Sequence, residues 1–259
     1  MDGEDGRLLD RLKPGPRVRG FTRGLLDIVM PPVAFDGGDR PLASGLSGDV
    51  WTRVAFLEDP VCDGCGVAFD HDPGPLGHDR CAACQTEPHV FARARAACLY
   101  DEGSRDLILA LKHADRLEYA PLFTRWLSRA AAPLIGDADA VVPVPLHWTR
   151  LLSRRANQAA EVARPLARAS GRAYLPDALV RTRRTPTQGG KSARGRRLNV
   201  RSAFSVAPSR EKDVRGRRIL LIDDVLTTGA TADACARVLL AAGARAVDVA
   251  VIARVRSRA

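Results

Sequence analysis

The sequence contains no run of about 18 uncharged apolar residues, the length that a membrane-spanning helix requires. Its first 20 residues are polar and contain glycine and proline, and no apolar run with a small-residue cleavage site follows them. We therefore expect residues 1–20 to form a flexible tail rather than a secretory signal. Together these absences predict a protein without a membrane span.

Lysine is scarce, because four of the 40 basic residues are lysines and the others are arginines. Against 30 acidic residues they give a formal net charge of +10, which suits a polyanion or a phosphorylated small molecule as partner. A coding bias towards arginine would produce the same balance, so charge alone does not identify the partner. The 259 residues, 46% of them hydrophobic, suffice for one large domain or for one domain with a small module.

The cysteine pattern argues against a disulfide framework. Two of the six cysteines, Cys98 and Cys235, stand alone and are expected to pack as small core residues. The other four form two close pairs separated by 15 residues: Cys62, Cys65, Cys81 and Cys84. This spacing is typical of a structural Zn²⁺ site, in which four thiolates complete the tetrahedron, and it indicates a reducing, cytoplasmic location. Two redox pairs or unligated thiols are the alternatives.

From about residue 96 the hydrophobic pattern alternates between the period of a strand and that of a helix. Strands are expected at 96–100, 138–144, 218–222 and 247–253, and helices at 107–126, 158–169 and 231–242. Pro121 should break the first of these helices, and Pro165 should kink the second. Strand, helix and strand in this order form a right-handed unit, so the sequence predicts an α/β domain with a parallel sheet.

The most informative segment is ILLIDDVLTTGAT, residues 219–231. Its apolar residues predict a buried strand that ends in Asp223 and Asp224, followed by a turn and a helix that begins at Thr231. Free amides at the start of such a helix can hold a phosphate, and Gly229 would let the backbone approach it closely. Carboxylates beside a phosphate suit ribose hydroxyls, a Mg²⁺ or a developing positive charge. A Walker A loop is excluded because its Gly-Lys-Ser/Thr ending is missing, and a purely structural turn would not need two acids.

This segment resembles the phosphoribosyl-pyrophosphate signature of type I phosphoribosyltransferases. Further segments resemble the ComF family of competence-associated, phosphoribosyltransferase-like proteins: the cysteine module, LILALKH (107–113), VVPVPLHWTRLLSRRANQAAEVA (141–163), TPTQGGKSARGRRLNVRSAF (185–204) and AGARAVDVAVIAR (242–254). The resemblance covers about residues 20–255. It implies a three-layer α/β/α domain of the type I phosphoribosyltransferase fold with a parallel sheet, preceded by a small zinc-ribbon module.

The resemblance also implies roles for residues of this sequence. Asp223 and Asp224 would contact the ribose hydroxyls at a catalytic centre. The ribose 5-phosphate would lie against Thr227, Thr228, Gly229, Ala230 and Thr231. Pyrophosphate and its Mg²⁺ would lie at the loop that contains Val144 and Pro145. The remaining candidates belong to the segment after that loop and to a basic flap: Arg154, Asn157, Gln158, Gln188, Arg194, Arg196 and Arg197. Apart from the resemblance, Lys112 follows a helical run and could face the pocket, but an exposed helix end is the expected position.

The family pattern divides the chain into four parts. After the tail, residues 21–57 would be the degenerate first half of a double zinc ribbon, 58–92 the four-cysteine ribbon and 93–259 the phosphoribosyltransferase-like domain. Family members often carry further cysteine pairs in the first half, whereas this chain has no cysteine before Cys62. One of the two metal sites is therefore not expected here.

Positive charge is concentrated in residues 150–201, which carry fourteen basic and two acidic side chains, a net charge of +12. A polyphosphate ligand and single-stranded DNA both suit this charge, although a single aromatic residue, Tyr174, offers little for stacking bases. A solvated arginine-rich face without a ligand is the alternative. Three functions remain open. They are a Mg²⁺-dependent phosphoribosyltransferase with an unknown acceptor, a sensor of phosphoribosyl pyrophosphate or a nucleotide, and a cytoplasmic factor that handles single-stranded DNA with DNA-uptake proteins.

Overall fold

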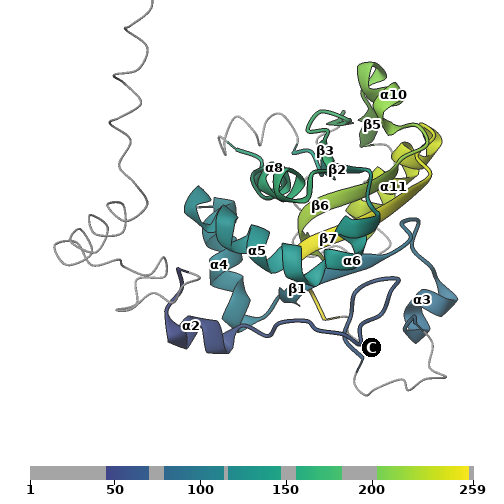
Figure 1. Ribbon diagram of the computed structural model, residues 1–259. Coiled ribbons are helices and arrows are strands. Elements are labelled where there is room, and N and C mark those ends of the chain that lie inside the picture. The colour runs from purple at the N-terminus through teal and green to yellow at the C-terminus, as the bar shows by residue number, and fades with distance from the viewer. Residues whose placement is uncertain (1–44, 70–78, 114–115, 147–155, 183–202, 257–259) are drawn as a thin grey trace, which may run out of the picture. The chain divides into compact units, whose positions relative to one another are not determined.

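The computed structural model of the protein describes residues 45–69, 79–113, 116–146, 156–182 and 203–256 (Figure 1). The chain divides into two compact units, residues 1–48 and 49–259, and the features discussed below belong to the second. In the ranges that the structure describes, no helix combines the length and the apolar character needed to cross a bilayer.

A five-stranded sheet forms the centre of the second unit. Its strands lie in the order β1-β7-β6-β2-β3, and every neighbouring pair is parallel. The bounds of these strands are β1 Ala94–Leu99, β2 Ala140–Pro143, β3 Ala173–Tyr174, β6 Arg218–Leu226 and β7 Ala246–Arg254. A separate antiparallel pair consists of β4 (Leu179–Arg181) and β5 (Phe204–Val206). The predicted parallel sheet is therefore confirmed.

Helices connect these strands and precede them. Their bounds are α2 Gly48–Arg53, α3 Ala82–Thr86, α4 Glu102–His113, α5 Ala120–Ala130, α6 Ala132–Asp137, α8 Gln158–Ser170, α10 Glu211–Val214 and α11 Ala230–Ala241. Short 3-10 turns, η2 and η3, lie at Leu117–Tyr119 and Pro208–Arg210. Two of the helices, α8 and α11, follow the strand ends that carry the candidate residues.

The prolines of the helical segments have different effects. The segment with helical periodicity over 107–126 is divided, since α4 ends at His113 and α5 begins at Ala120. Pro121 lies in the first turn of α5, where the missing N–H would have no helical partner. Pro165 lies inside α8, which continues to Ser170. A break is therefore present, but it lies before Ala120 and not at Pro121, which belongs to the first turn of the second helix.

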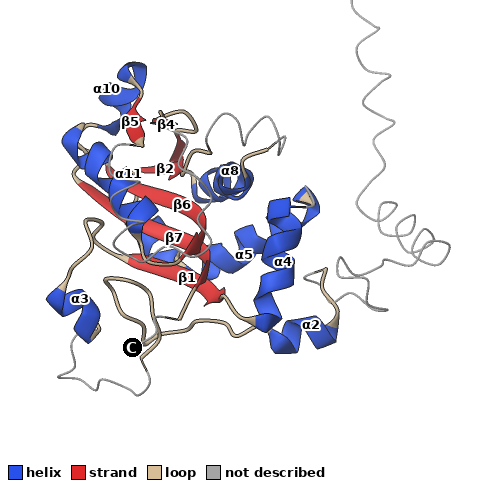
Figure 2. Cartoon of the chain, turned by 180° about the vertical axis from the view of Figure 1, so that it is seen from behind, coloured by secondary structure: helices blue, strands red, loops and turns tan. Residues whose placement is uncertain are grey.

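Helices cover both faces of the sheet (Figures 1 and 2). Alternate residues of a strand point to opposite faces, and Ile219 and Leu221 of β6 share a buried core with Leu239 of α11. Leu220, between them, is fully buried on the other face, where α8 packs against β2 and β6 and α5 packs against β1 and β7. The three-layer α/β/α arrangement is therefore confirmed.

The chain leaves two neighbouring strands in opposite directions. From β6 it passes through α11 on one face to β7, whereas from β2 it passes through α8 on the other face to β3. The helices that follow β6 and β2 therefore lie on opposite faces of the sheet. In open α/β sheets, ligands bind at the carboxyl ends of the strands at such a switch point. The topology directs the search for a ligand site to this edge.

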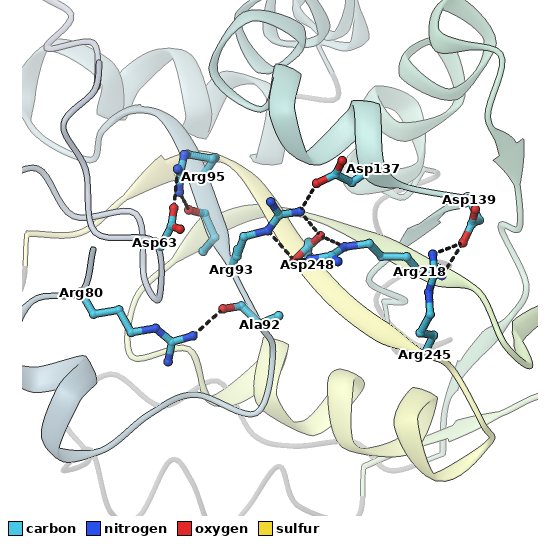
Figure 3. A network of polar contacts seen from close by, with 11 residues as sticks. Asp63, Arg80, Ala92, Arg93, Arg95, Asp137, Asp139, Arg218, Arg245 and Asp248 are labelled. Carbon is cyan, nitrogen blue, oxygen red and sulfur yellow. Dashed lines mark hydrogen bonds and ion pairs between the residues drawn. The ribbon is translucent and has the colours of Figure 1, made fainter. Parts of the chain in front are cut away.

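A charged network lies at the opposite, amino-terminal edge of the sheet (Figure 3). Asp248 of β7 is completely buried and accepts hydrogen bonds from Arg93 Nη2 at 2.9 Å and Arg218 Nε at 2.7 Å. Arg93 also donates to Asp137 at the end of α6, at 2.8 Å. Two guanidinium groups thus compensate the buried carboxylate and join the segment before β1 to β6 and β7.

Residues 49–57 pack beside the outer edge strand, β1. The amide of Leu57 donates to the carbonyl of Ala97 at 3.0 Å. The ring of Phe56 packs edge-on against Trp126 of α5, with the ring centroids 4.9 Å apart. The end of the segment expected as a degenerate half-ribbon therefore contributes to the packing of the sheet domain.

Candidate functional site

Strand β6 extends four residues past its neighbour β2 at the switch point. The last main-chain bond between them runs from the amide of Val144 to the carbonyl of Ile222, at 2.8 Å. The Val144 carbonyl, which would accept the next bond of a parallel ladder from Asp224, instead accepts from Asn157 Nδ2 at 3.0 Å. The amide of Asp224 donates to the carboxylate of Asp223 at 2.9 Å. Both acids therefore lie where β6 no longer has β2 as a partner.

The two acids have different surroundings. Alternation places Asp223 on the face of α11 and Asp224 on the opposite face, where its Oδ2 lies 2.8 Å from Nζ of Lys112. Burial, and next the charge of Asp224, raise the pKa of Asp223 to about 7. Lys112, expected at an exposed helix end, is therefore the counter-ion of Asp224. The sequence signal for Lys112 was its position after the helical run LILAL. That signal places Lys112 at a helix end, but only tertiary packing determines which group it contacts.

The raised pKa of Asp223 makes the stability of the protein dependent on pH. The folded protein keeps this proton up to about pH 7, whereas the unfolded chain loses it near pH 4. Between these values the folded state binds more protons, so the free energy of unfolding falls as the pH rises. We expect Asp223→Asn to exceed the wild type in stability by about 1–3 kcal/mol at pH 8 and not at pH 4, as measured by urea unfolding. The same difference at both pH values would contradict this prediction.

The backbone amides of the loop after β6 are a further feature of this edge. No group in the part of the chain that the structure describes accepts a hydrogen bond from the amides of residues 227–232. The first helical bond of α11 is donated by Asp233 to the carbonyl of Gly229, at 2.8 Å. Such amides, together with the positive end of the helix dipole, favour a bound anion. The threonine side chains of the loop are exposed or partly exposed: Thr227, Thr228 and Thr231.

His89, which the sequence did not single out, lies against this loop. Gly229 is buried with a φ of +75°, and a Cβ there would lie 2.5 Å from Cε1 of His89. Nδ1 of His89 lies 3.0 Å from Oδ2 of Asp233. The close approach on the Cα side of Gly229 is therefore made by an imidazole. No local pattern could have revealed it, since 144 positions separate His89 from Asp233.

Asn157 and Gln158 lie at the start of α8, beside the end of β2. Asn157 caps the helix, because its Oδ1 accepts from the amide of Ala159 at 3.2 Å while its Nδ2 bonds Val144. Gln158 is 3% exposed, and its Nε2 has no hydrogen-bond partner within the described ranges. Val144 is buried, and Pro145 is partly buried. The structure thus brings these four candidates to the same edge as the acids of β6. Five further candidates lie outside the described residues: Arg154, Gln188, Arg194, Arg196 and Arg197.

The four paired cysteines lie within reach of a single ion. Their sulfur atoms all lie within 4.8 Å of one another, and Sγ of Cys65 is 3.8 Å from Sγ of Cys81. Zinc–sulfur bonds of about 2.3 Å give a tetrahedron with edges of about 3.8 Å. Gly64 lets the two pairs approach, because a Cβ there would lie 3.0 Å from Cβ of Cys84. All four thiols are free, so the cluster fits a closed tetrahedral metal site.

We expect protein purified under reducing conditions to contain one zinc ion per chain. Chelation should loosen residues 58–90 while the sheet stays folded, because the module is too small to fold without its metal. Metal analysis and hydrogen exchange measure the two effects. Cys81→Ser should lose the ion, and Cys98→Ser, outside the cluster, should keep it. Metal-free protein with an equally protected module would contradict this expectation.

Comparison with known proteins places the chain among characterised families. Residues 128–259 match the phosphoribosyl transferase domain family. DNA utilization protein YhgH of Escherichia coli (strain K12) is 34% identical over 217 residues, which cover 81% of this chain and 91% of that protein. Competence protein F of Haemophilus influenzae is 30% identical over 223 residues, which cover 78% and 93%. Among solved structures, glutamine phosphoribosylpyrophosphate amidotransferase from B. subtilis aligns with 46% of this chain and 24% of that chain, at 26% identity and a TM-score of 0.31.

The family match spans half of the chain and includes both strand ends that carry the candidate site. The two relatives match over about four-fifths of the chain and over nearly all of their own length. The chain therefore belongs to the ComF family, whose members carry a phosphoribosyl transferase domain.

Proposed function

We propose that this protein binds phosphoribosyl pyrophosphate, or a related ribose phosphate, with Mg²⁺ at the carboxyl ends of β6 and β2. The observation that carries the proposal is the proximity of two acids, Asp223 and Asp224, to the amides of residues 227–232, which donate to no group among the described residues. The amides suit a 5-phosphate, and the carboxylates suit the ribose hydroxyls. A phosphorylated ribose offers both groups within one small ligand.

The start of α8 suits the pyrophosphate group. Gln158 offers a buried Nε2 without a partner among the described groups, and Asn157 holds the helix start against Val144. Bound Mg²⁺ would neutralise the charge on the pyrophosphate oxygens. Lys112 would be free to turn from Asp224 towards the ligand once that acid binds a hydroxyl or the cation.

Transfer of the phosphoribosyl group to an acceptor would use the same residues. The bond from the anomeric carbon to pyrophosphate breaks ahead of the formation of the bond to the acceptor, so the sugar carries positive charge in the transition state and pyrophosphate leaves with the bonding electrons. Asp223 and Asp224 would stabilise that charge. The acceptor is unknown, so a sensor that binds the ligand without turnover is the alternative use of this site.

Isothermal titration with phosphoribosyl pyrophosphate, with and without Mg²⁺, tests the binding. We expect Mg²⁺-dependent binding, weaker binding of ribose 5-phosphate, and still weaker binding of inorganic phosphate. Equal affinity for all three would mean that the acids do not contact the sugar. Pyrophosphate release in the presence of candidate bases would then identify an enzyme. Binding without pyrophosphate release, whichever acceptor is supplied, would identify a sensor.

A second candidate function is the handling of single-stranded DNA in the cytoplasm, and two relatives with the names DNA utilization protein and competence protein favour a role that involves DNA. The net charge of +12 in residues 150–201 supports it. We expect a salt-dependent affinity for single-stranded DNA that falls when Arg194, Arg196 and Arg197 are neutralised. As a matched control, neutralising three exposed arginines elsewhere should have little effect: Arg105, Arg129 and Arg237. Equal losses in the two triple variants would contradict a dedicated DNA surface.

A further inference from the structure

The cysteine module is anchored to the sheet at the start of β1. The amide of Ala94 donates to the carbonyl of Asp63 at 2.9 Å, and Arg95 Nη2 donates to the Asp63 carboxylate at 2.5 Å. On the other side of the module, Arg80 donates to the carbonyl of Ala92 at 3.1 Å (Figure 3). Asp63 lies between the first two cysteines and Arg80 directly precedes the third. The anchors therefore start from residues that lie next in sequence to the cysteines that a bound metal would hold.

The chain leaves the module through residues 87–91. This segment lies against residues 227–232, which we call the phosphate loop. Helix α3 ends before this segment, and after it the amide of Ala92 donates to Val247 of β7 at 2.8 Å. His89 lies in the middle of the segment, with its ring stacked on Phe91 at 4.4 Å between centroids and 11° between planes. Phe91 is 2% exposed. The imidazole therefore stacks on a core residue and also lies close to Gly229.

The same segment bonds to the first turn of α11 through the carboxylate of Asp233. Asp233 accepts from the amide of Val90 at 2.7 Å with one oxygen and lies 3.0 Å from Nδ1 of His89 with the other. The side chains of His89 and Asp233 are 15% and 20% exposed, so water competes weakly for the contact. The amide of Asp233 also makes the first helical bond, to Gly229. The segment thus holds both ends of that bond.

We infer that His89 is a positioning residue for the phosphate loop, through which metal in the four-cysteine module raises the affinity of that loop for an anion. The inference rests on the proposed function, because it assumes that residues 227–232 hold a phosphate. Only four residues separate Cys84 from His89, so release of the metal frees one end of the segment. His89 then leaves Gly229 and Asp233, and the loop amides lose their fixed direction.

Isothermal titration of ribose 5-phosphate against zinc-loaded and chelated protein tests the coupling. Removal of the metal should weaken binding by wild type about tenfold, within the usual range of coupling between two sites. His89→Ala should bind about tenfold more weakly while loaded with zinc, and chelation should then weaken it less than about twofold. Equal effects of chelation on wild type and His89→Ala, or wild-type affinity in loaded His89→Ala, would overturn the inference.

Two further variants separate positioning from a loss of packing. In His89→Asn the side-chain amide can donate to Asp233 as Nδ1 does, so we expect part of the affinity and of the metal dependence to return. Val90→Ala removes a side chain that is 37% exposed but keeps the amide that bonds Asp233, so it should behave as wild type. A loss in Val90→Ala as large as that in His89→Ala would assign the effect to general packing and overturn the inference.

Hydrogen exchange without ligand tests the same coupling independently of the proposed function. In wild type, the amide of Asp233 should exchange faster after chelation than before it. In His89→Ala, this amide should exchange fast even when the protein is loaded with zinc. If zinc-loaded wild type binds neither phosphoribosyl pyrophosphate nor ribose 5-phosphate while this exchange pattern holds, the proposed function fails and the positioning role stands. If the ligand binds but neither chelation nor His89→Ala changes the exchange rate of the Asp233 amide, the positioning role fails and the proposed function stands.

Discussion

Replacement of both acids of β6, Asp223→Asn with Asp224→Asn, should lower the affinity for phosphoribosyl pyrophosphate at least about 100-fold. Hydrogen bonds that involve a charged group contribute about 1.5–3 kcal/mol each, and the neutral amides would also attract Mg²⁺ poorly. The free energy of unfolding should stay the same or rise, because burial and the neighbouring carboxylate both disfavour the ionised Asp223. Isothermal titration and urea unfolding measure the two effects.

Asp106→Asn is the matched control, since Asp106 is an exposed acid of the same domain on α4. It should bind the ligand as wild type does. A double variant that unfolds readily would instead identify the two acids as structural residues. A double variant that is stable and binds as wild type would remove them from the site.

Asp248→Ala should lower the free energy of unfolding by about 3 kcal/mol without lowering the affinity for the ligand. The substitution removes the buried carboxylate that accepts hydrogen bonds from both Arg93 and Arg218, so two neighbouring guanidinium groups lose their shared counter-ion. Breaking a buried ion pair by removing one partner costs about 3–5 kcal/mol, and the partial exposure of both arginines places the value at the lower end. Urea unfolding gives the stability, and titration with phosphoribosyl pyrophosphate gives the affinity.

Asp137→Asn controls for the exposed arm of the same network (Figure 3). Asp137 is 53% exposed and bonds Arg93 alone among the described residues, so its loss should cost less than about 1 kcal/mol. Equal costs for the two variants would show that burial of Asp248 is not what makes the network important. A large loss of affinity in Asp248→Ala would show that the two edges of the sheet are not independent.

Local patterns predicted the elements that carry the site. The apolar run before Asp223 and the alanine-rich segment after Gly229 predicted the strand and helix, because each has the period of its element. The strand nevertheless continues past the acids to Leu226, since β7 still pairs with it after β2 has ended. A sequence shows where a strand begins to be polar but not which neighbours extend it.

Contacts between distant segments lay beyond the sequence. Lys112 bonds Asp224 because α4 packs near the end of β6, and His89 reaches Asp233 because the exit from the cysteine module crosses α11. The glycine at 229 was expected to make room for a phosphate, and the structure uses its missing Cβ for the ring of His89. One residue pattern thus had two physical explanations, which only the packing distinguishes.

Hydrogen exchange in the presence of phosphoribosyl pyrophosphate and Mg²⁺ is the most direct test of where the ligand lies. The amides of residues 227–232, which donate to no described group, should exchange much more slowly once they bond phosphate oxygens. Peptides around Asp248, at the other edge of the sheet, should not change. Saturating ligand that leaves residues 227–232 exchanging at their original rate would contradict the account.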